Sequence, residues 1–116
     1  MLLLVGRAFA LALAVLRELA DARRSGQGGL TLDAVASRLR VDPLQIEPVL
    51  DTLIAHDWVG RLDEGGGQRH TLMCEPANTP AAPLVDALLL APQAAAQSFR
   101  QRSGLEQMTL AELLKA

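Results

Sequence analysis

The sequence predicts a mainly α-helical protein with a small two-stranded β-wing. Two helical segments follow each other closely: Thr31–Arg40, and then a helix that begins at Asp42 within the stretch that runs to Val59. A glycine-rich hairpin at Val59–Met73 comes next. Helix, tight turn, helix and wing in this order are the pattern of a winged helix-turn-helix, here with flanking helices at both ends. We expect a single domain over residues 1–116, made of an N-terminal helix (1–24), a winged helix-turn-helix core (29–74) and a C-terminal helical extension (79–116).

The overall composition narrows the class of protein. Half of the 116 residues are apolar and 21% are charged, which is typical of a globular chain. The formal net charge of −2 gives no global basic field of the kind that attracts nucleic acid. Cys74 is the only cysteine, so an internal disulfide and a cysteine metal cluster are both excluded. A reducing, cytoplasmic setting fits this cysteine usage best.

The first helix is expected from about Leu3 to Arg24 and is unusually apolar. Its longest apolar run, Ala8–Leu16, is shorter than the roughly 20 residues that a bilayer span needs, so we expect no membrane span in this chain. The helix carries two adjacent apolar stripes where a surface helix needs one. Either the chain itself packs on both sides of this helix, or one stripe meets a partner subunit. The stripes are Phe9, Ala12, Leu13, Leu16 and Ala20 in one case, and Leu11, Val15 and Leu19 in the other.

The two helices of the core have clear start residues. Thr31 can cap the first of them. Asp42 caps the second, with Pro43 at its first position and Gln45 three residues after the cap. Pro48 lies inside this second helix, where it removes a hydrogen bond, so we expect an irregular or kinked first turn. The apolar face of the second helix consists of Ile46, Val49, Leu50, Leu53 and Ile54.

The wing is expected as two short strands around a glycine-rich tip. The first strand covers Trp58–Leu62, the tip is Asp63–Gly67, and the second strand covers Gln68–Met73. Residues Glu75–Asn78 then form a loop. The pattern predicts further helices beyond it.

Three helical segments are expected in the C-terminal extension. Thr79 is predicted to cap a helix that has Pro80 at its first position and runs to about Leu90. A weaker helix, Pro92–Gln101, ends at Ser103 and Gly104. Thr109 and Glu112 have the spacing of a capping box, which predicts a last helix that contains Leu110, Leu113 and Leu114.

No residue pattern indicates catalysis, a metal site or a cofactor. His56 and His70 are the only histidines, and neither belongs to an HxxxH or HExxH motif. We expect His70 on the surface of the wing and His56 at a helix C-terminus, where it interacts with the helix dipole. Cys74 has no activating neighbour in sequence and is expected to be partly buried and inert.

Nucleic-acid binding is one of two serious hypotheses, because winged helices commonly place the second helix of the motif in the major groove. The outward residues of that helix are expected to be Leu44, Gln45, Glu47, Pro48, Asp51 and Thr52. No lysine or arginine lies between Pro43 and Ala55, and carboxylates that face phosphates reduce affinity. Glu47 and Asp51 therefore disfavour DNA. If DNA is bound, the expected contacts are Gln45, Thr52, Arg61 and Arg69; otherwise the two arginines are solvated and paired with Asp63 or Glu64.

The other hypothesis is a protein-interaction module. The first helix and the C-terminal leucines supply more apolar helix surface than one small core needs, and surplus apolar faces mark interfaces. The simplest partner is a second copy of the chain, although the C-terminal helices could instead fold back over the first helix. The residues predicted to mediate self-association are Phe9, Leu16, Leu88, Leu89 and Leu113.

Residues Gly29–Met73 resemble winged helix-turn-helix domains in general, through GLTLDAVASRLRV, DPLQIEPVLDTLIAHDWVGRL and the glycine-tipped wing. More narrowly, the chain resembles the cytoplasmic C-terminal region of BrkB/YihY-type inner-membrane proteins. This resemblance is carried by AFALALAVLRELADAR, LDTLIAHDWVGRLDEGG and TPAAPLVDALLLAP, which together cover most of the chain. It implies a soluble domain on the cytoplasmic face of the inner membrane, with the spanning part upstream, and it transfers no catalytic residue.

From the sequence we therefore expect a non-enzymatic interaction or regulatory module without metal or cofactor, whose partner is another protein or a second copy. The alternative is a DNA-binding transcriptional regulator that uses the helix-turn-helix and the wing.

Overall fold

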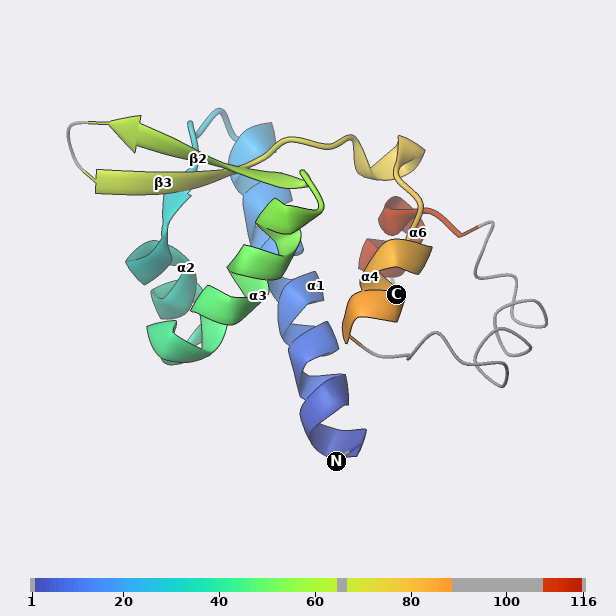
Figure 1. Ribbon diagram of the computed structural model, residues 1–116. Helices are drawn as coiled ribbons and strands as arrows, with labels where there is room; N and C mark the ends of the chain where they lie inside the picture. Colours follow the sequence, from blue (N-terminus) through green and yellow to red (C-terminus); the bar gives the residue numbers. More distant parts are fainter. Residues whose placement is uncertain (1, 65–66, 89–107, 116) are drawn as a thin grey trace. The chain divides into compact units, whose positions relative to one another are not determined.

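The computed structural model describes residues 2–64, 67–88 and 108–115 (Figure 1). The chain divides into two compact units. One unit is Leu11–Cys74, and the other combines Met1–Ala10 with Glu75–Ala116. Helix α1 (Leu2–Arg24) contributes residues to both units, and each unit is described by itself below.

Helix α1 begins and ends where the sequence predicts. Residues of both apolar stripes are buried, among them Leu16 from the first and Val15 and Leu19 from the second. Burial on both stripes is what a helix covered by its own chain on two sides requires. The helix ends in a turn in which Gly26 has a φ of +82° and Gln27 N–H donates to Ala22 O at 2.9 Å.

Helix α2 (Leu32–Leu39) is capped at both ends by local chemistry. The Thr31 hydroxyl accepts a hydrogen bond from Ala34 N–H at 3.1 Å, as the sequence predicts. Arg40 ends the helix in the left-handed region with a φ of 56°, and its N–H donates to the carbonyls of Ala36 and Ser37. This left-handed residue turns the chain sharply toward α3.

Helix α3 (Pro43–Ala55) has the predicted start, because an Asp42 carboxylate oxygen accepts from Leu44 N–H at 2.9 Å. Its buried residues are Ile46, Val49, Leu50 and Leu53. The helix is continuous through Pro48, whose carbonyl accepts from the Thr52 hydroxyl at 3.2 Å. His56 ends the helix, and Asp57 follows with a φ of 60°.

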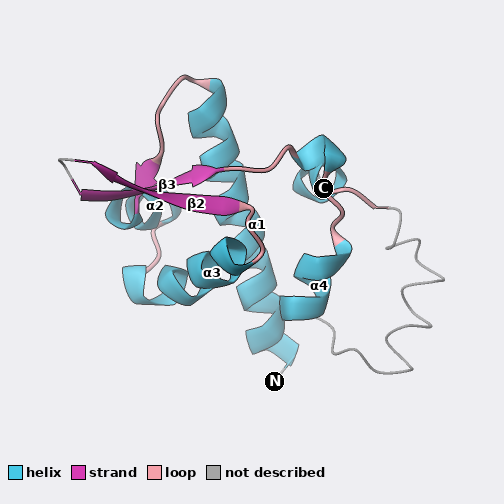
Figure 2. Ribbon diagram, turned by 45° about the horizontal axis from the view of Figure 1, so that its top comes forward, coloured by secondary structure: helices cyan, strands magenta, loops and turns pink. Residues whose placement is uncertain are grey.

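The sheet has three antiparallel strands in the order β1-β3-β2, so the expected two-stranded wing gains a third strand (Figures 1 and 2). These strands are β1 (Leu30–Thr31), β2 (Val59–Glu64) and β3 (Gly67–Leu72). Asp63, Glu64 and Gly67 belong to the paired strands rather than to the tip, because Asp63 pairs with Gln68 and Glu64 with Gly67. Both strands of the hairpin are therefore longer toward the tip than predicted.

Arg23 connects the end of α1 with the end of β3. Its guanidinium donates to Leu72 O at 3.3 Å and to Cys74 O at 2.9 Å. Trp58 and Leu72, at the base of the hairpin, are 7% and 4% exposed. The hairpin is thus anchored at its base within the unit Leu11–Cys74.

The second unit is held together by pairing between distant segments. It contains a 3₁₀ turn, η1 (Pro76–Asn78), where a loop was expected, followed by α4 (Ala82–Leu88) and α6 (Leu110–Lys115). The prediction that Thr79 caps a helix is wrong. Thr79 O accepts from Leu110 N–H at 2.6 Å and Pro80 bridges Thr109, so this segment is extended and α4 begins at Ala82.

The capping box of the last helix is confirmed. Glu112 N–H donates to the Thr109 hydroxyl oxygen at 3.3 Å, and Thr109 N–H donates to a Glu112 carboxylate oxygen at 3.3 Å. Ala82 and Val85 form a small core with Phe9, Met108 and Leu113. The helix predicted at 92–101, the break at 103–104 and the end of the preceding helix at residue 90 lie outside the described residues.

Candidate functional site

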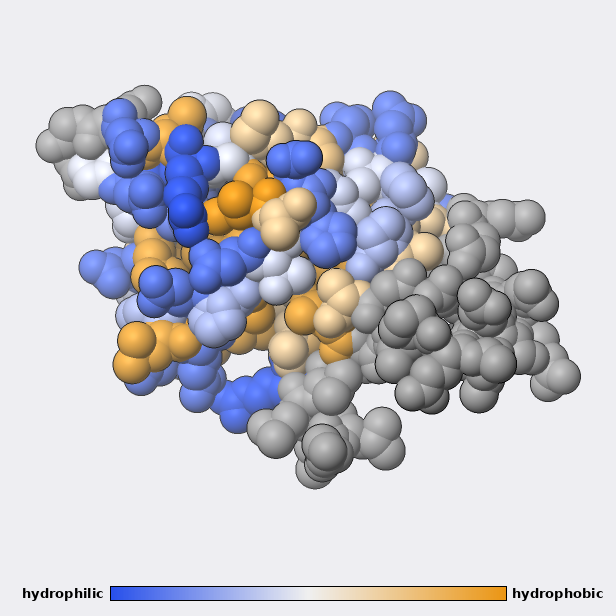
Figure 3. Space-filling view, viewed as in Figure 1, coloured by the Kyte–Doolittle hydropathy of each residue, from blue (hydrophilic) through white to orange (hydrophobic). Residues whose placement is uncertain are grey.

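The exposed face of α3 is the one that the sequence predicts. Gln45, Glu47, Pro48 and Asp51 are exposed, and Thr52 is half-buried. Leu44, at the first turn, is 74% exposed. In Figure 3 the surface over α2, α3 and the hairpin is mainly hydrophilic, with separate apolar areas. This face therefore combines carboxylates with an uncovered leucine.

Arg61 of β2 forms an ion pair with Asp51 of α3, at 2.9 Å between guanidinium nitrogen and carboxylate oxygen. The prediction that Arg61 would pair with Asp63 or Glu64 is therefore wrong. Arg61 lies opposite His70 in the sheet register, on the sheet face that is turned toward α3. Both side chains of the pair are about half exposed, at 46% and 59%, so the pair adds little stability. Its effect is to engage the one arginine that the wing directs toward α3.

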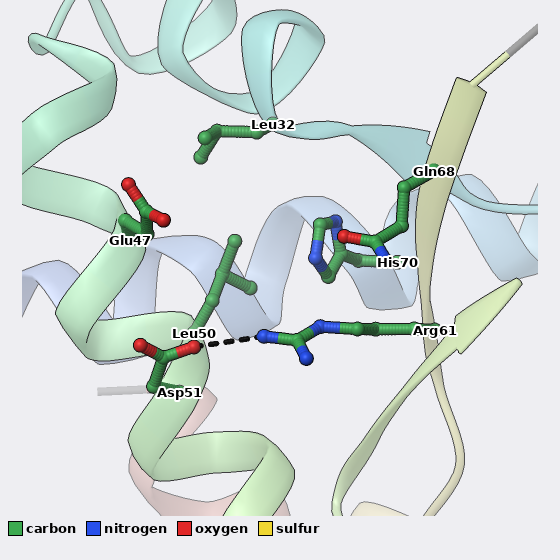
Figure 4. Close-up of a pocket in the computed structure, with 7 residues that line it drawn as sticks. All are labelled: Leu32, Glu47, Leu50, Asp51, Arg61, Gln68 and His70. Atoms are coloured by element: carbon green, nitrogen blue, oxygen red, sulfur yellow. Dashed lines mark hydrogen bonds and ion pairs between the residues drawn. The ribbon is translucent and has the colours of Figure 1, made fainter. Parts of the chain in front are cut away.

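A groove lies between α3 and the wing, with a volume of about 90 Å³ (Figure 4). We call it the α3–wing groove. Leu32 and Leu50 contribute its apolar lining. Its polar lining consists of Glu47, Asp51, Arg61, Gln68 and His70. The side chains come from α2, α3, β2 and β3, so no short stretch of sequence could have revealed the set.

His70 is 5% exposed, which contradicts the prediction of a surface residue on the wing. It lies two residues before the buried Leu72 on β3, and alternate residues of a strand share a face. Nδ1 of its ring is buried and has no hydrogen-bond partner among the described residues. Burial lowers the pKa of His70 below its usual 6.5, and a hydrogen bond with the backbone of Leu30 opposes this shift.

Arg69 lies on the opposite face of the hairpin from Arg61. In the register Arg61 pairs with His70 and Leu62 pairs with Arg69, and successive strand residues point to opposite faces. Arg69 borders a second, shallow pocket of about 330 Å³ together with Arg38 and the Gln27–Thr31 segment. The two wing arginines named as DNA contacts therefore cannot approach one phosphate group together.

The other two residues considered for chemistry, His56 and Cys74, do not line either groove. His56 is at the end of α3 as predicted, where its Nδ1 is 2.9 Å from Thr52 O and its ring packs against Trp58 with ring centres 5.6 Å apart. Cys74 is half-buried. In the part of the chain that the structure describes, no three side chains of His, Cys, Asp or Glu gather in a way that could hold a metal ion.

The residues predicted for self-association are partly used inside the chain. Leu16 is fully buried, and Phe9 and Leu113 pack against Ala82 and Val85. Leu88 is half-buried at the end of α4, and Leu89 lies outside the described residues. The described residues of this set therefore leave less apolar surface exposed for self-association than the sequence suggests.

The chain is similar to membrane proteins, although no protein-family model matches it. It is 53% identical over 109 residues to a UPF0761 membrane protein of Methylibium petroleiphilum, a match that covers 94% of this chain and 26% of that protein. It is 44% identical over 119 residues to a UPF0761 membrane protein of Delftia acidovorans, covering 96% and 28%. The chain thus spans about a quarter of the length of the curated relatives it matches. Among the residues that the structure describes, none of the helices has the length and apolar character that crossing a bilayer demands.

Several solved structures share the fold. CymR of Bacillus subtilis, described as the global cysteine regulator, has a TM-score of 0.69 at 19% identity over 93% of each chain. CymR of Staphylococcus aureus has a TM-score of 0.67 at 18% identity, covering 95% of this chain and 97% of that one. IscR of T. potens has a TM-score of 0.63 at 20% identity, covering 96% and 83%. At these identities the likeness concerns the fold alone, and it confirms the winged helix that the sequence predicts.

Proposed function

We propose that this chain is a non-catalytic winged-helix module that binds another protein through the exposed face of α3. We further propose that it works as the non-spanning part of a larger membrane protein of the UPF0761 or BrkB/YihY kind. The similarity to proteins about four times its length supports this context. We infer protein binding rather than DNA binding from the charge of α3, because its exposed face presents Glu47 and Asp51 and no cation.

DNA affinity depends on cations that neutralise phosphates, typically about six to ten contacts in strong binders. Helix α3 has no lysine or arginine from Pro43 to Ala55, and Arg61 is engaged by Asp51. A phosphate near α3 would meet two carboxylates. Binding to a protein surface has no such requirement, because the rim of a protein interface is polar and solvent-accessible and can hold carboxylates around an apolar contact.

The second candidate function is DNA binding, as a transcriptional regulator that uses Gln45, Thr52, Arg61 and Arg69. It is favoured by the fold, which is shared with proteins named as regulators. For this function the Arg61–Asp51 pair would have to open, and Arg61 and Arg69 would have to contact different phosphates.

One titration separates the two functions. The chain is titrated with random-sequence and genomic duplex DNA at low and at moderate salt, and binding is followed by fluorescence anisotropy. We expect no saturable binding at micromolar protein. Micromolar or tighter, salt-sensitive binding that Arg61→Ala and Arg69→Ala abolish would establish the DNA-binding function instead. Arg24→Ala is the control, since it also removes an exposed cation that is paired with a carboxylate, but one at the end of α1.

A further inference from the structure

The α3–wing groove contains several polar groups that the chain itself does not satisfy. The Glu47 carboxylate and the Gln68 amide form no hydrogen bond or ion pair with any described residue. Nδ1 of His70 is likewise without a partner in the described chain, although its ring is almost fully buried. Glu47 and Gln68 are exposed, so water can satisfy them, whereas a buried polar atom is normally hydrogen-bonded within the protein. The unsatisfied Nδ1 of His70, beside an unpaired carboxylate and an unpaired amide, therefore indicates that the groove receives a ligand with polar groups of its own.

The charged side chains of the groove indicate whether the ligand is positively or negatively charged. Glu47 and Asp51 contribute two carboxylates, Arg61 contributes one guanidinium, and burial favours the neutral form of His70. The groove is therefore net negative. A cation that enters it offsets the excess charge, whereas a phosphate would increase the repulsion.

The ion pair within the groove shows which cation fits. The Arg61 guanidinium is 2.9 Å from an Asp51 oxygen and reaches that oxygen across the groove from β2 (Figure 4). Glu47 precedes Asp51 by four residues, so both carboxylates project from the same side of α3. A second guanidinium beside Glu47 would repeat the contact that Arg61 already makes. Arginine suits this geometry better than lysine, because its planar donors match a carboxylate in pairs.

We propose that the α3–wing groove binds an arginine side chain of a partner protein. The guanidinium contacts Glu47, the Gln68 amide oxygen and His70 complete its hydrogen bonds, and the aliphatic stem lies against Leu32. Leu44, three residues before Glu47 on α3, is 74% exposed and supplies an apolar contact on the same side of the helix. The partner surface is therefore basic with an adjacent apolar residue. This inference rests on the proposed protein-binding function and names the chemistry of its partner.

The test uses two capped tripeptides, acetyl-Ala-Arg-Ala-amide and the same peptide with citrulline, which is nearly isosteric with arginine but uncharged. Each is titrated into the isotopically labelled full chain, and NMR shifts of the Gln68 side-chain amide and the His70 ring are followed. We expect saturable shifts with the arginine peptide and at least tenfold weaker binding of the citrulline peptide. Equal binding of both peptides, or no shift with either, overturns the proposal.

Two variants locate the contact. Glu47→Gln removes the unpaired carboxylate of the groove, and we expect it to weaken binding of the arginine peptide at least tenfold. Asp33→Asn removes the same charge from an exposed position on α2 that does not line the groove, and we expect less than a twofold change. Equal effects of the two variants would mean nonspecific attraction to an acidic surface and would overturn the site.

A titration with inorganic phosphate tests the opposite assignment. Saturable shifts of the same Gln68 and His70 signals, strengthened by Glu47→Gln, would make this an anion site and overturn the proposal. The DNA titration described above remains independent. Tight DNA binding defeats the proposed function whatever the peptide does, whereas absence of both DNA and peptide binding defeats only the arginine site.

Discussion

At the scale of single residues, His70 couples the stability of the fold to pH. Burial lowers its pKa below 6.5 in the folded chain, while the unfolded chain keeps a value near 6.5. The unfolded state therefore binds the proton more readily. This contribution to stability is fully present above pH 6.5 and is lost as the pH falls through the lowered folded-state pKa.

We therefore expect the free energy of unfolding, measured by urea denaturation, to decrease between about pH 7 and pH 5, above the range where most carboxylates titrate. His70→Gln removes the titrating group and should flatten this dependence. The matched control, His56→Gln, leaves His70 in place and should keep the slope. An unchanged slope in His70→Gln would show that other groups cause the pH dependence.

At the scale of elements, the third strand depends on one glycine. Gly29 immediately precedes β1 and has a φ of +125°. A Cβ at this position would lie 2.9 Å from the backbone oxygen of His70, on the neighbouring strand β3. Close approach of the two backbones therefore requires the absence of a side chain.

Gly29→Ala is expected to destabilise the unit Leu11–Cys74 by about 1–3 kcal/mol from backbone strain, with a further cost from the clash with the His70 carbonyl. Gly28→Ala is the natural control, because a Cβ there meets nothing within 4 Å. Its effect should stay within about 0.5 kcal/mol. Thermal unfolding followed by circular dichroism compares the two variants, and equal midpoints would contradict the role given to Gly29.

At the scale of the whole molecule, self-association is still a prediction. Leu88 is half-buried, and Phe9 and Leu113 already pack within the chain. We therefore expect weak association that is visible only at high protein concentration. Light scattering should show the mass rising above 12.4 kDa as concentration increases, and Leu88→Gln should restore the single-chain mass. A mass of 12.4 kDa at every concentration contradicts this prediction.

Much of the fold follows from local sequence chemistry. The caps at Thr31, Asp42 and Thr109 involve residues at most three positions apart, so residue identity and spacing were sufficient. Thr79 has similar local chemistry, yet its backbone pairs with Leu110. Pairing with a distant segment thus overrode a local helix-capping preference. Such long-range pairing cannot be predicted from the spacing of neighbouring residues.

The candidate site was less predictable for the same reason. The exposed face of α3 follows from helical periodicity and was predicted correctly. The ion pair between Arg61 and Asp51 joins a strand to a helix, and strand β1 has only two residues, too few for any alternation to appear. The burial of His70 follows from its shared strand face with Leu72, but the register that places this face against α3 exists only in the folded chain.

The sharing of α1 between the two units has a consequence for synthesis on the ribosome. All residues of the unit Leu11–Cys74 emerge before Leu113, which packs with Phe9 in the core around Ala82 and Val85. At about 5–20 residues per second, the 39 residues from Cys74 to Leu113 require about 2–8 s. During this interval the nascent chain can already hold a folded winged helix, while the small core that Phe9 shares with Ala82 and Val85 still lacks Leu113.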